Sequence, residues 1–384
     1  MAMSTEFLKK IAVRIGTRKN SVFTYPVDKQ KEYVNHFPEP KDGFERAYYQ
    51  YCCQMKLYGK PIHIAINFAA LPLSLYYLNQ FGKSSVAEAK HADAVFFNDG
   101  KPFNIIPDSV LERYSNIITL SSDKRQLRKE DKVFLKSIFR KYPFSWMLWL
   151  KTVIKIAQYS YAISTYAPNA IISCSEFSFV SPILTEYCHT RGVKLINVMH
   201  GEKLYYMRDT FACYDEYYVW DQYYVDLLTD LRADKAQFRV ELPASMQIKK
   251  QSDIDIQYDY TYYLAAENKE TLQVIADALR LLQNKGKRIS VRPHPRYSNV
   301  TLVRELFDFA NIEDYKAVTI EQSLLQTGNA ISLFSTVLNQ AVSASIPIVI
   351  DDLCTPANFH KLKELRYICL NKEHNLLSEV IGEL

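Results

Sequence analysis

Glycine is scarce in this sequence, with 10 copies in 384 residues, and the seven cysteines are odd in number and include no Cys-x-x-Cys pair. Scattered cysteines of this kind are typical of reduced thiols in a cytoplasmic protein, so we expect no disulfide framework. The N-terminus lacks the apolar core of a signal peptide, and we find no uncharged apolar run of about 18 residues. These absences predict a cytoplasmic chain without a membrane-spanning helix.

Several catalytic motifs are also absent. The sequence has no Gly-x-Gly-x-x-Gly loop, no Walker A lysine loop and no Gly-x-Ser-x-Gly elbow, which argues against hydride transfer, P-loop phosphotransfer and α/β-hydrolase chemistry. No His/Cys cluster has zinc spacing, and no Asp-x-Asp triplet ends a predicted strand in the first half, so we expect no metal site. The net charge of +5 is too small to indicate nucleic-acid binding, but it suits anionic ligands such as nucleotides, or a membrane surface.

The length and the pattern of apolar segments predict two α/β domains. Short apolar runs alternate with longer helical patterns, which is typical of parallel sheets covered by helices. We predict an N-terminal domain at 1–243, a linker at 244–258 and a C-terminal domain at 259–384. Both are expected to be Rossmann-like, doubly wound sheets that face an interdomain cleft, with ligands at the carboxyl ends of the strands. The predicted strands are Ile62–Ile66, Ala94–Phe97, Asn116–Leu120, Ala170–Ser173, Lys194–Val198, Glu216–Trp220, Tyr262–Ala265, Arg288–Arg292, Ala317–Ile320, Ala330–Phe334, Pro347–Ile350 and Tyr367–Leu370.

A basic loop follows one predicted strand of the C-terminal domain. Arg292, His294 and Arg296 alternate there with two prolines that stiffen the backbone. Arginine offers paired donors to phosphate oxygens, and a histidine can donate to a phosphate or protonate a leaving group. The alternative is a rigid exposed turn whose basic residues are incidental.

Two hydroxyl residues, Ser335 and Thr336, stand where a later strand of the same domain passes into a helix. Such a helix start presents free N–H groups and the positive end of the helix dipole to a phosphate. The alternative is an ordinary helix N-cap. Asp351 and Asp352, after the next strand, could hold a ribose hydroxyl or an amine, or lie in a solvated loop.

Three loops of the N-terminal domain carry candidate acceptor-side residues. His200, Gly201 and Lys203 follow one strand, where His200 is a candidate base for the acceptor hydroxyl, and the alternative there is a structural histidine. Asp99, in an Asn-Asp-Gly segment, and Glu176 each follow another strand and could take a proton from an acceptor hydroxyl. A simple turn explains the first acid equally, and helix capping explains the second.

These motifs together resemble the GT-B glycosyltransferase superfamily. The resemblance lies in His200-Gly201 after a strand, Arg292-Pro293-His294-Pro295, and Ser335-Thr336. It is closest to the bacterial capsule and lipopolysaccharide transferases that use CMP-sugars, the sialyl- and Kdo-transferases, and to the CDP-glycerol transferases. In those families a His-Pro pair and a Ser-Ser or Ser-Thr pair contact the phosphate of the cytidine nucleotide.

The resemblance implies that His294, Ser335 and Thr336 contact the donor phosphate, with the donor in the C-terminal domain and the acceptor on the N-terminal one. Bacterial sialyltransferases carry an acidic-acidic-Gly motif whose acid is the base, which corresponds to Asp99, although Asn98 departs from it. The implied activity is metal-independent transfer of a sugar, favoured as CMP-linked, to an oligosaccharide or lipid-linked glycan acceptor of a capsule or lipopolysaccharide. No cofactor beyond the nucleotide-sugar is expected.

Two other functional classes remain open. A UDP-sugar transferase or a UDP-GlcNAc 2-epimerase-like isomerase would use the same fold, the latter without an acceptor. A non-catalytic polysaccharide assembly or export protein would bind no nucleotide.

The segment from Lys124 to Lys141 carries eight basic residues and is followed by several aromatic residues. Such a segment could dock peripherally on the inner face of the bacterial cytoplasmic membrane. The alternative is an amphipathic helix whose basic face is solvated.

Overall fold

The computed structural model describes residues 22–81, 90–248 and 255–382, and they form two compact units. Unit 1 comprises the chain up to His200 together with Tyr205–Ala244. Unit 2 comprises Gly201–Leu204 and Ser245–Leu384, so a short excursion after His200 groups with the later part of the chain.

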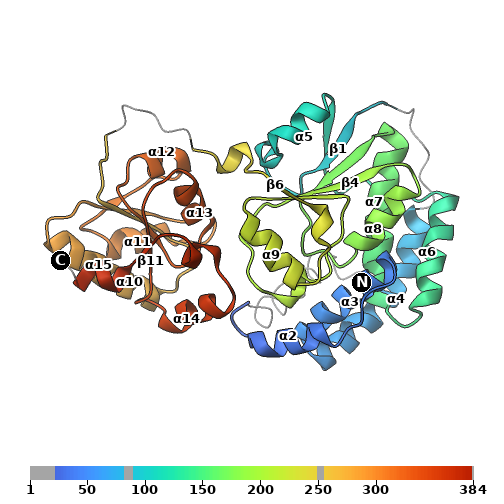
Figure 1. Cartoon of the computed structure of the whole chain (residues 1–384), viewed down its shortest axis with the longest axis horizontal. Helices are drawn as coiled ribbons and strands as arrows, with labels where there is room; N and C mark the ends of the chain where they lie inside the picture. Colours follow the sequence, from blue (N-terminus) through green and yellow to red (C-terminus); the bar gives the residue numbers. More distant parts are fainter. Residues whose placement is uncertain (1–21, 82–89, 249–254, 383–384) are drawn as a thin grey trace. The chain divides into compact units, whose positions relative to one another are not determined.

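Unit 1 is built on a parallel sheet of six strands in the order β2-β1-β3-β4-β5-β6 (Figure 1). The sequence order reverses at β1, because the chain passes from β1 to β2 on one side and returns to β3 on the other. The carboxyl edge between β1 and β3 is therefore the switch point at which ligands bind in such sheets. The strands are β1 (Ala94–Phe97), β2 (Ile117–Leu120), β3 (Ala170–Ser173), β4 (Lys194–Val198), β5 (Glu216–Val219) and β6 (Phe238–Val240).

Both faces of this sheet are covered, which explains why its central strands are continuous apolar runs. Phe96 and Ile172 point to one face, where they pack with Val110 of α5. Phe97, on the opposite face, stacks on Tyr159 of α7 with ring centroids 5.2 Å apart. The helices of this unit are α2 (Val27–Asn35), α3 (Gly43–Tyr58), α4 (Lys60–Phe81), α5 (Asp108–Arg113), α6 (Lys129–Lys141), α7 (Trp146–Tyr166), α8 (Ser181–His189) and α9 (Gln222–Asp230).

Helix α4 corrects two predictions. The predicted strand Ile62–Ile66 lies inside it, because the apolar sequence continues uncharged from Pro61 to Phe81, much longer than a strand. By length and composition alone this helix could cross a membrane, so the expectation that no segment could do so is wrong. Only 11% of its most apolar 18-residue window is buried within the protein.

Unit 2 contains a second parallel sheet, in the order β12-β11-β10-β7-β8-β9. The order reverses at β7, so its switch point is the carboxyl edge between β7 and β10. Helices α10 and α11 pack on one face of the sheet through a common apolar cluster that includes Leu279 and Val303 (Figure 1). The strands are β7 (Tyr260–Tyr263), β8 (Ile289–Arg292), β9 (Asn311–Ile312), β10 (Ala330–Ser332), β11 (Ile348–Ile350) and β12 (Asn375–Leu376), and the helices are α10 (Lys269–Asn284), α11 (Val300–Leu306), α12 (Ile320–Leu325), α13 (Thr336–Ser343), α14 (Pro356–Glu364) and α15 (Leu377–Gly382).

Two predicted strands of unit 2 are not strands. In Ala317–Ile320, Thr319 is the N-cap of α12 and forms a reciprocal capping box with Gln322, which starts a helix. Tyr367–Leu370 leads into a 3₁₀ helix, Ile368–Asn371. Both sheets are parallel and doubly wound, so the predicted α/β class with two Rossmann-like sheets is confirmed.

Candidate functional site

The Asn-Asp-Gly segment at the end of β1 forms a tight turn at the switch point of unit 1. Asp99 has φ of 44° and Gly100 has φ of 79°, and the N–H of Lys101 donates to the carbonyl of Asn98 at 2.7 Å. The turn interpretation is therefore confirmed. The carboxylate of Asp99 lies 4.0 Å from the Nζ of Lys155, at one-third exposure, and its role as a base stays a prediction.

Glu176 and His200 come together at the ends of the adjacent strands β3 and β4. One carboxylate oxygen of Glu176 lies 2.7 Å from Nδ1 of His200, and the other accepts the backbone N–H of His200 at 2.9 Å. The glutamate side chain is 1% exposed and the histidine 13%. The carboxylate thus faces the Nδ1 side of the ring at ion-pair distance, although these two atoms do not have hydrogen-bond geometry, and Nε2 is the nitrogen on the other side of the ring.

The loop that carries Glu176 is itself anchored to the sheet. Asn197 of β4 accepts the backbone N–H of Ser175 at 2.9 Å and the hydroxyl of Ser173 at 3.2 Å. Tyr214 donates its hydroxyl to the Ser175 carbonyl at 2.9 Å. The pair is therefore held by groups that are themselves fixed, as a preorganised site requires.

Three cations near this edge were not recognised from the sequence. Lys151 and Lys155 lie on α7, and Arg208 lies in the short 3₁₀ helix Met207–Asp209. Burial, with Lys155 and Arg208 nearby, lowers the pKa of Lys151 to about 7. A lysine pair at i, i+4 on a helix beside a strand end is the sequence signal that could have found the two lysines.

In unit 2, Ser335 and Thr336 stand at the switch point, directly after β10. Ser335 is the N-cap of α13, and its side-chain oxygen accepts the N–H of Val337 at 3.2 Å. The N-cap prediction is therefore confirmed. The Ser335 hydroxyl keeps its own proton to donate, and both residues are half-buried at the positive end of the helix.

The loop after β8 brings His294 toward the same edge. Its backbone N–H donates to the hydroxyl of Ser298 at 2.8 Å, and that hydroxyl contacts the carbonyl of Ala265, at the end of β7, at 3.4 Å. Nδ1 of His294 accepts the N–H of Arg296 at 3.0 Å, so the ring proton resides on Nε2. Burial and the neighbouring Arg296 lower the pKa of His294, which keeps the ring neutral and makes Nε2–H a hydrogen-bond donor.

Three predicted ligand residues of unit 2 bind other groups of the protein instead. Arg292 is buried, with Nη1 2.7 Å from Glu313 and Nη2 donating to the Val318 carbonyl at 2.8 Å. Asp351 accepts the Tyr262 hydroxyl at 2.6 Å, and Asp352 accepts the backbone N–H of Ser378 at 2.9 Å. We therefore assign these side chains structural roles, because their polar atoms hold the fold together.

The remaining predicted residues are placed as follows. Arg296 is exposed on the loop after β8. Gly201 is half-buried and Lys203 buried, in the excursion that groups with unit 2. Among the described residues, no group of three or more His, Cys, Asp or Glu side chains is arranged to hold a metal ion.

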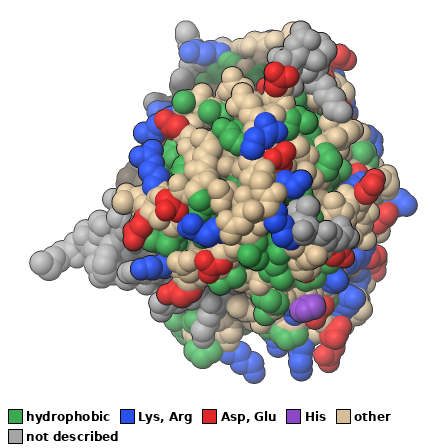
Figure 2. All heavy atoms as spheres, turned by 90° about the vertical axis from the view of Figure 1, so that its left-hand side faces the viewer, with side chains coloured by type: hydrophobic (Ala, Val, Ile, Leu, Met, Phe, Trp, Pro, Cys, Tyr) green, Lys and Arg blue, Asp and Glu red, His purple; other side chains and the backbone are tan. Residues whose placement is uncertain are grey.

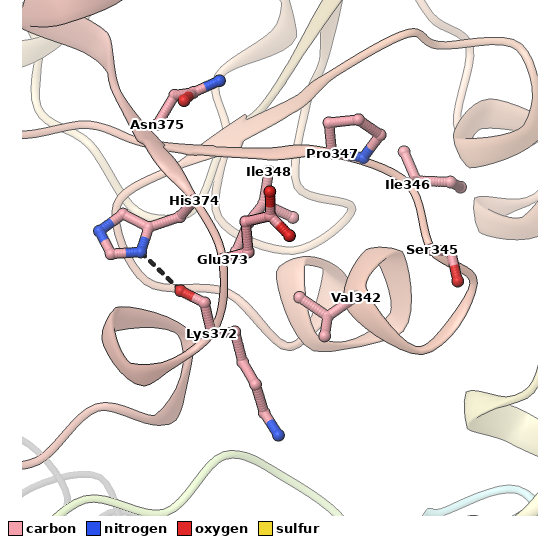
Figure 3. A pocket seen from close by; sticks show the side chains of 9 residues that line it. All are labelled: Val342, Ser345, Ile346, Pro347, Ile348, Lys372, Glu373, His374 and Asn375. Atoms are coloured by element: carbon pink, nitrogen blue, oxygen red, sulfur yellow. Dashed lines mark hydrogen bonds between the residues drawn. The ribbon is translucent and has the colours of Figure 1, made fainter.

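A cavity of about 400 Å³ in unit 2 lies away from these residues (Figure 3). It is lined by Val342 of α13, by the start of β11 at Ile348 and by the segment from Lys372 to Asn375 that leads into β12. In a parallel sheet the starts of the strands lie at the edge opposite to their carboxyl ends. The cavity is thus at the amino edge, and the candidate site is at the carboxyl edge.

The fold and the two polar switch points define an α/β protein with a candidate ligand site on each unit. No family model and no curated protein matches the sequence. Solved structures similar to it include the wall teichoic acid polymerase TagF, with 10% identity and a TM-score of 0.45 over 84% of this chain and 88% of that one. The UDP-GlcNAc 2-epimerase of Methanocaldococcus jannaschii, solved with UDP-GlcNAc and UDP, is 14% identical, with a TM-score of 0.42 over 73% and 92%.

The lipopolysaccharide outer core galactosyltransferase WaaB is also similar, with 12% identity and a TM-score of 0.41 over 75% of this chain and 93% of that one. At these identities and TM-scores we take no activity or residue role from the similarity, and the proposals below rest on the residues of this chain.

Proposed function

We propose that the protein is a glycosyltransferase that moves a sugar or polyol unit from a nucleotide-activated donor to a growing surface polysaccharide, with His200 as the base. The observation that carries the proposal is the buried Glu176–His200 pair at the carboxyl edge of unit 1, with atoms 2.7 Å apart. The buried carboxylate holds Nδ1 and stabilises the imidazolium, so Nε2 can accept a proton. Glu176, one oxygen of which accepts the backbone N–H of His200 while the other lies at Nδ1, is a positioning residue, and Asp99 remains the alternative base.

In the proposed reaction, Nε2 of His200 takes the proton of the acceptor hydroxyl. The acceptor oxygen then bonds to the transferred carbon as the bond from that carbon to the donor phosphate breaks. The phosphate leaves with the electron pair and accepts hydrogen bonds from Nε2–H of His294, the hydroxyls of Ser335 and Thr336, and the N–H groups that start α13. Preorganised donors of this kind stabilise developing negative charge and require no metal ion.

The neutral state of His294 refines the role proposed for it. A neutral imidazole donates one hydrogen bond through Nε2 but has no second proton to give to a leaving group. We therefore propose that His294 binds the phosphate without acting as a general acid, and that Arg296 supplies positive charge beside it.

A thermal-shift panel of CMP, CDP, UDP, GDP and ADP tests the donor side, because a ligand of the folded state raises the melting temperature. Stabilisation by CMP or CDP alone supports the favoured cytidine donor. Stabilisation by UDP alone supports a UDP-sugar transferase or an isomerase, and these two are separated by incubating the UDP-sugar without an acceptor and looking for its epimer. If none of the five stabilises the protein, the proposal fails and a non-catalytic assembly role takes its place.

We also propose that unit 1 docks on an anionic membrane surface through α4 and α6, where a lipid-linked acceptor would be present. α4 packs on α7 along one side, and elsewhere it exposes Ile64 by 57% and Phe68 by 64%. Phe144, whose carbonyl accepts the Asn67 side-chain amide at 2.7 Å, adds another ring that is 77% exposed. A protein surface with clustered exposed apolar residues is typical of an interaction site.

The positive charge on the neighbouring helix α6 indicates which kind of partner this apolar surface fits. α6 also packs on α7 (Figure 1). Lys129, Lys132 and Lys136 are exposed on α6. Apolar residues beside lysines favour the interface of a membrane with anionic lipids. By contrast, the face of the molecule shown in Figure 2 intersperses Lys and Arg with Asp and Glu around small hydrophobic areas.

Flotation with phosphatidylcholine vesicles that do or do not contain phosphatidylglycerol tests this docking. The protein should float with anionic vesicles at low salt, and Phe68→Ser and the double variant Lys132→Glu/Lys136→Glu should each reduce flotation. The matched charge change in unit 2, Lys316→Glu/Lys363→Glu, should leave it unchanged. Absence of flotation with anionic vesicles at low salt rejects the membrane contact without affecting the proposed chemistry.

A further inference from the structure

Two lysines on α7 lie one helical turn apart at the carboxyl edge of the unit 1 sheet. α7 leads directly into β3, so it runs antiparallel to the strand and its N-terminal half lies beside the strand ends. Lys151, Lys155 and Tyr159 follow one another at intervals of four residues and so share a face of the helix. Tyr159 stacks on Phe97 at the end of β1, which shows that this face is turned toward the sheet.

Lys151 differs from the other two cations at this place in its charge partners. Lys155 faces Asp99 at 4.0 Å, and the guanidinium of Arg208 pairs with its neighbour Asp209 at 3.1 Å and also lies near the carboxylate of Glu176. Nζ of Lys151 lies 3.9 Å from the ring centroid of Phe179, and no carboxylate of the described residues is within ion-pair distance of it.

Such an arrangement costs free energy in the folded protein. Burial disfavours the charged form of a lysine, and a like charge at i, i+4 repels it. Both effects act on Lys151, whose pKa falls for these reasons. A bound anion would offset both the burial of the charge and the repulsion. If this position had only a structural role, an apolar side chain would fill it at a lower cost in free energy.

The cations also lie next to the proposed base. The guanidinium carbon of Arg208 is 4.9 Å from the ring centroid of Phe177 and 5.1 Å from that of Tyr206. The Phe177 ring is in turn 6.4 Å from the ring of His200. An anion held by these cations would therefore place the rest of its molecule beside the Glu176–His200 pair.

We propose that Lys151, Lys155 and Arg208 bind a phosphate or carboxylate group of the acceptor, so that the substrate class of unit 1 is an anionic glycan or polyol. This proposal rests on the proposed function for the identity of its ligand as an acceptor. The proposed binding of the anion does not depend on the nucleotide, because all three residues belong to unit 1.

Thermal shift without any nucleotide tests the site at pH 6.5, where Lys151 is mostly protonated. The probes are sn-glycerol 3-phosphate, N-acetylneuraminic acid and, as the neutral comparison, galactose, each at matched ionic strength. One or both anions should raise the melting temperature of the wild type, and galactose should not. Lys151→Met and Lys155→Met should each weaken the affinity for the anion by about 10- to 100-fold, which is the loss expected for a hydrogen bond to a charged group.

Two control variants test whether the anion binds at these three residues and not elsewhere. Lys132→Met removes an exposed lysine of α6, and Ser335→Ala removes a hydroxyl of unit 2, so neither should change the anion shift. Stabilisation by the phosphate alone or by the carboxylate alone identifies the group that is bound. If neither anion stabilises the wild type, or if the shift survives in both methionine variants, the proposal is overturned.

The nucleotide panel separates this proposal from the proposed function. Both methionine variants should keep the wild-type nucleotide shift, because the donor residues are in unit 2. If the protein binds a nucleotide but neither anion, the anionic-acceptor site is rejected and the transferase proposal stands. If it binds an anion but no nucleotide, the transferase proposal is rejected and the anion site stands.

Discussion

Oε2 of Glu176 lies 2.7 Å from Nδ1 of His200, within a pair whose carboxylate is almost completely buried. The backbone N–H of His200 donates to the other oxygen, so the glutamate cannot turn away without losing two contacts. A carboxylate that faces one ring nitrogen at this distance orients the imidazole and leaves its other nitrogen to meet a substrate.

We expect Glu176→Gln to lower kcat by about 100-fold or more, because the amide cannot stabilise the imidazolium. Initial rates measured at saturating donor and acceptor check this expectation.

The matched control is Asp215→Asn, which removes the carboxylate from another pair in unit 1, 2.6 Å from Nε2 of His189. His189 ends α8 and Asp215 precedes β5, so this pair lies at the amino edge of the sheet. The turnover of the Asp215→Asn variant should equal that of the wild type. Equal losses in the two variants would mean that the Glu176 effect is structural.

We expect His294→Ala to raise the donor KM by about 10- to 100-fold, because it removes one hydrogen bond to a charged phosphate. Burial and Arg296 lower the pKa of His294, and the neutral ring is the donor, so donor binding should not weaken as the pH rises from 6 to 8. His374→Ala, at the amino-edge cavity of unit 2, is the control. Donor affinity that falls steeply over this pH range would show that a charged imidazole binds the phosphate.

Arg292 should prove to be a stability residue. Replacing it with methionine leaves Glu313 buried without its cation, which should cost about 3–5 kcal/mol in the free energy of unfolding. Arg288→Met, which breaks an exposed pair with Asp259, should cost less than about 1 kcal/mol. Urea denaturation measures both, and a stable Arg292 variant with a raised donor KM would restore its predicted phosphate role.

Lys151 gives a prediction on stability and pH. Its pKa is lowered from 10.5 to about 7, so between these values the unfolded chain binds more protons at this site than the folded protein does. Stability from this group therefore rises as the pH increases from 7 toward 10.5. Lys151→Met should be more stable than the wild type at pH 6.5, with a smaller gain at pH 9.5, as measured by thermal denaturation. A variant that is less stable at both pH values would contradict the cost assigned to this lysine.

The sequence predicted those elements whose local pattern agrees with their final environment. The strands Ala94–Phe97, Ala170–Ser173 and Lys194–Val198 have the predicted bounds, because buried parallel strands are short apolar runs between polar loops. Ile62–Ile66 failed since a short apolar run alone does not distinguish a strand from part of a helix. In Ala317–Ile320, the Thr319–Gln322 capping box overrides the apolar residues.

For the site, the sequence indicated the loops but not the direction of each side chain. Arg292 was predicted to bind phosphate from its position at a strand end, yet its partner Glu313 is 21 residues away and meets it only in the folded sheet. The cations of α7 were overlooked for the same reason, because their position beside the strand ends follows from packing. The pairing of Glu176 with His200 likewise requires β3 and β4 to be neighbours.

The most direct measurement is the turnover of His200→Ala with the donor whose nucleotide stabilises the wild type. The account predicts that kcat falls by about 10²- to 10⁴-fold, the usual contribution of a general base, while the nucleotide thermal shift is unchanged. Turnover near that of the wild type, with the same thermal shift, would contradict the assignment of His200 as the base.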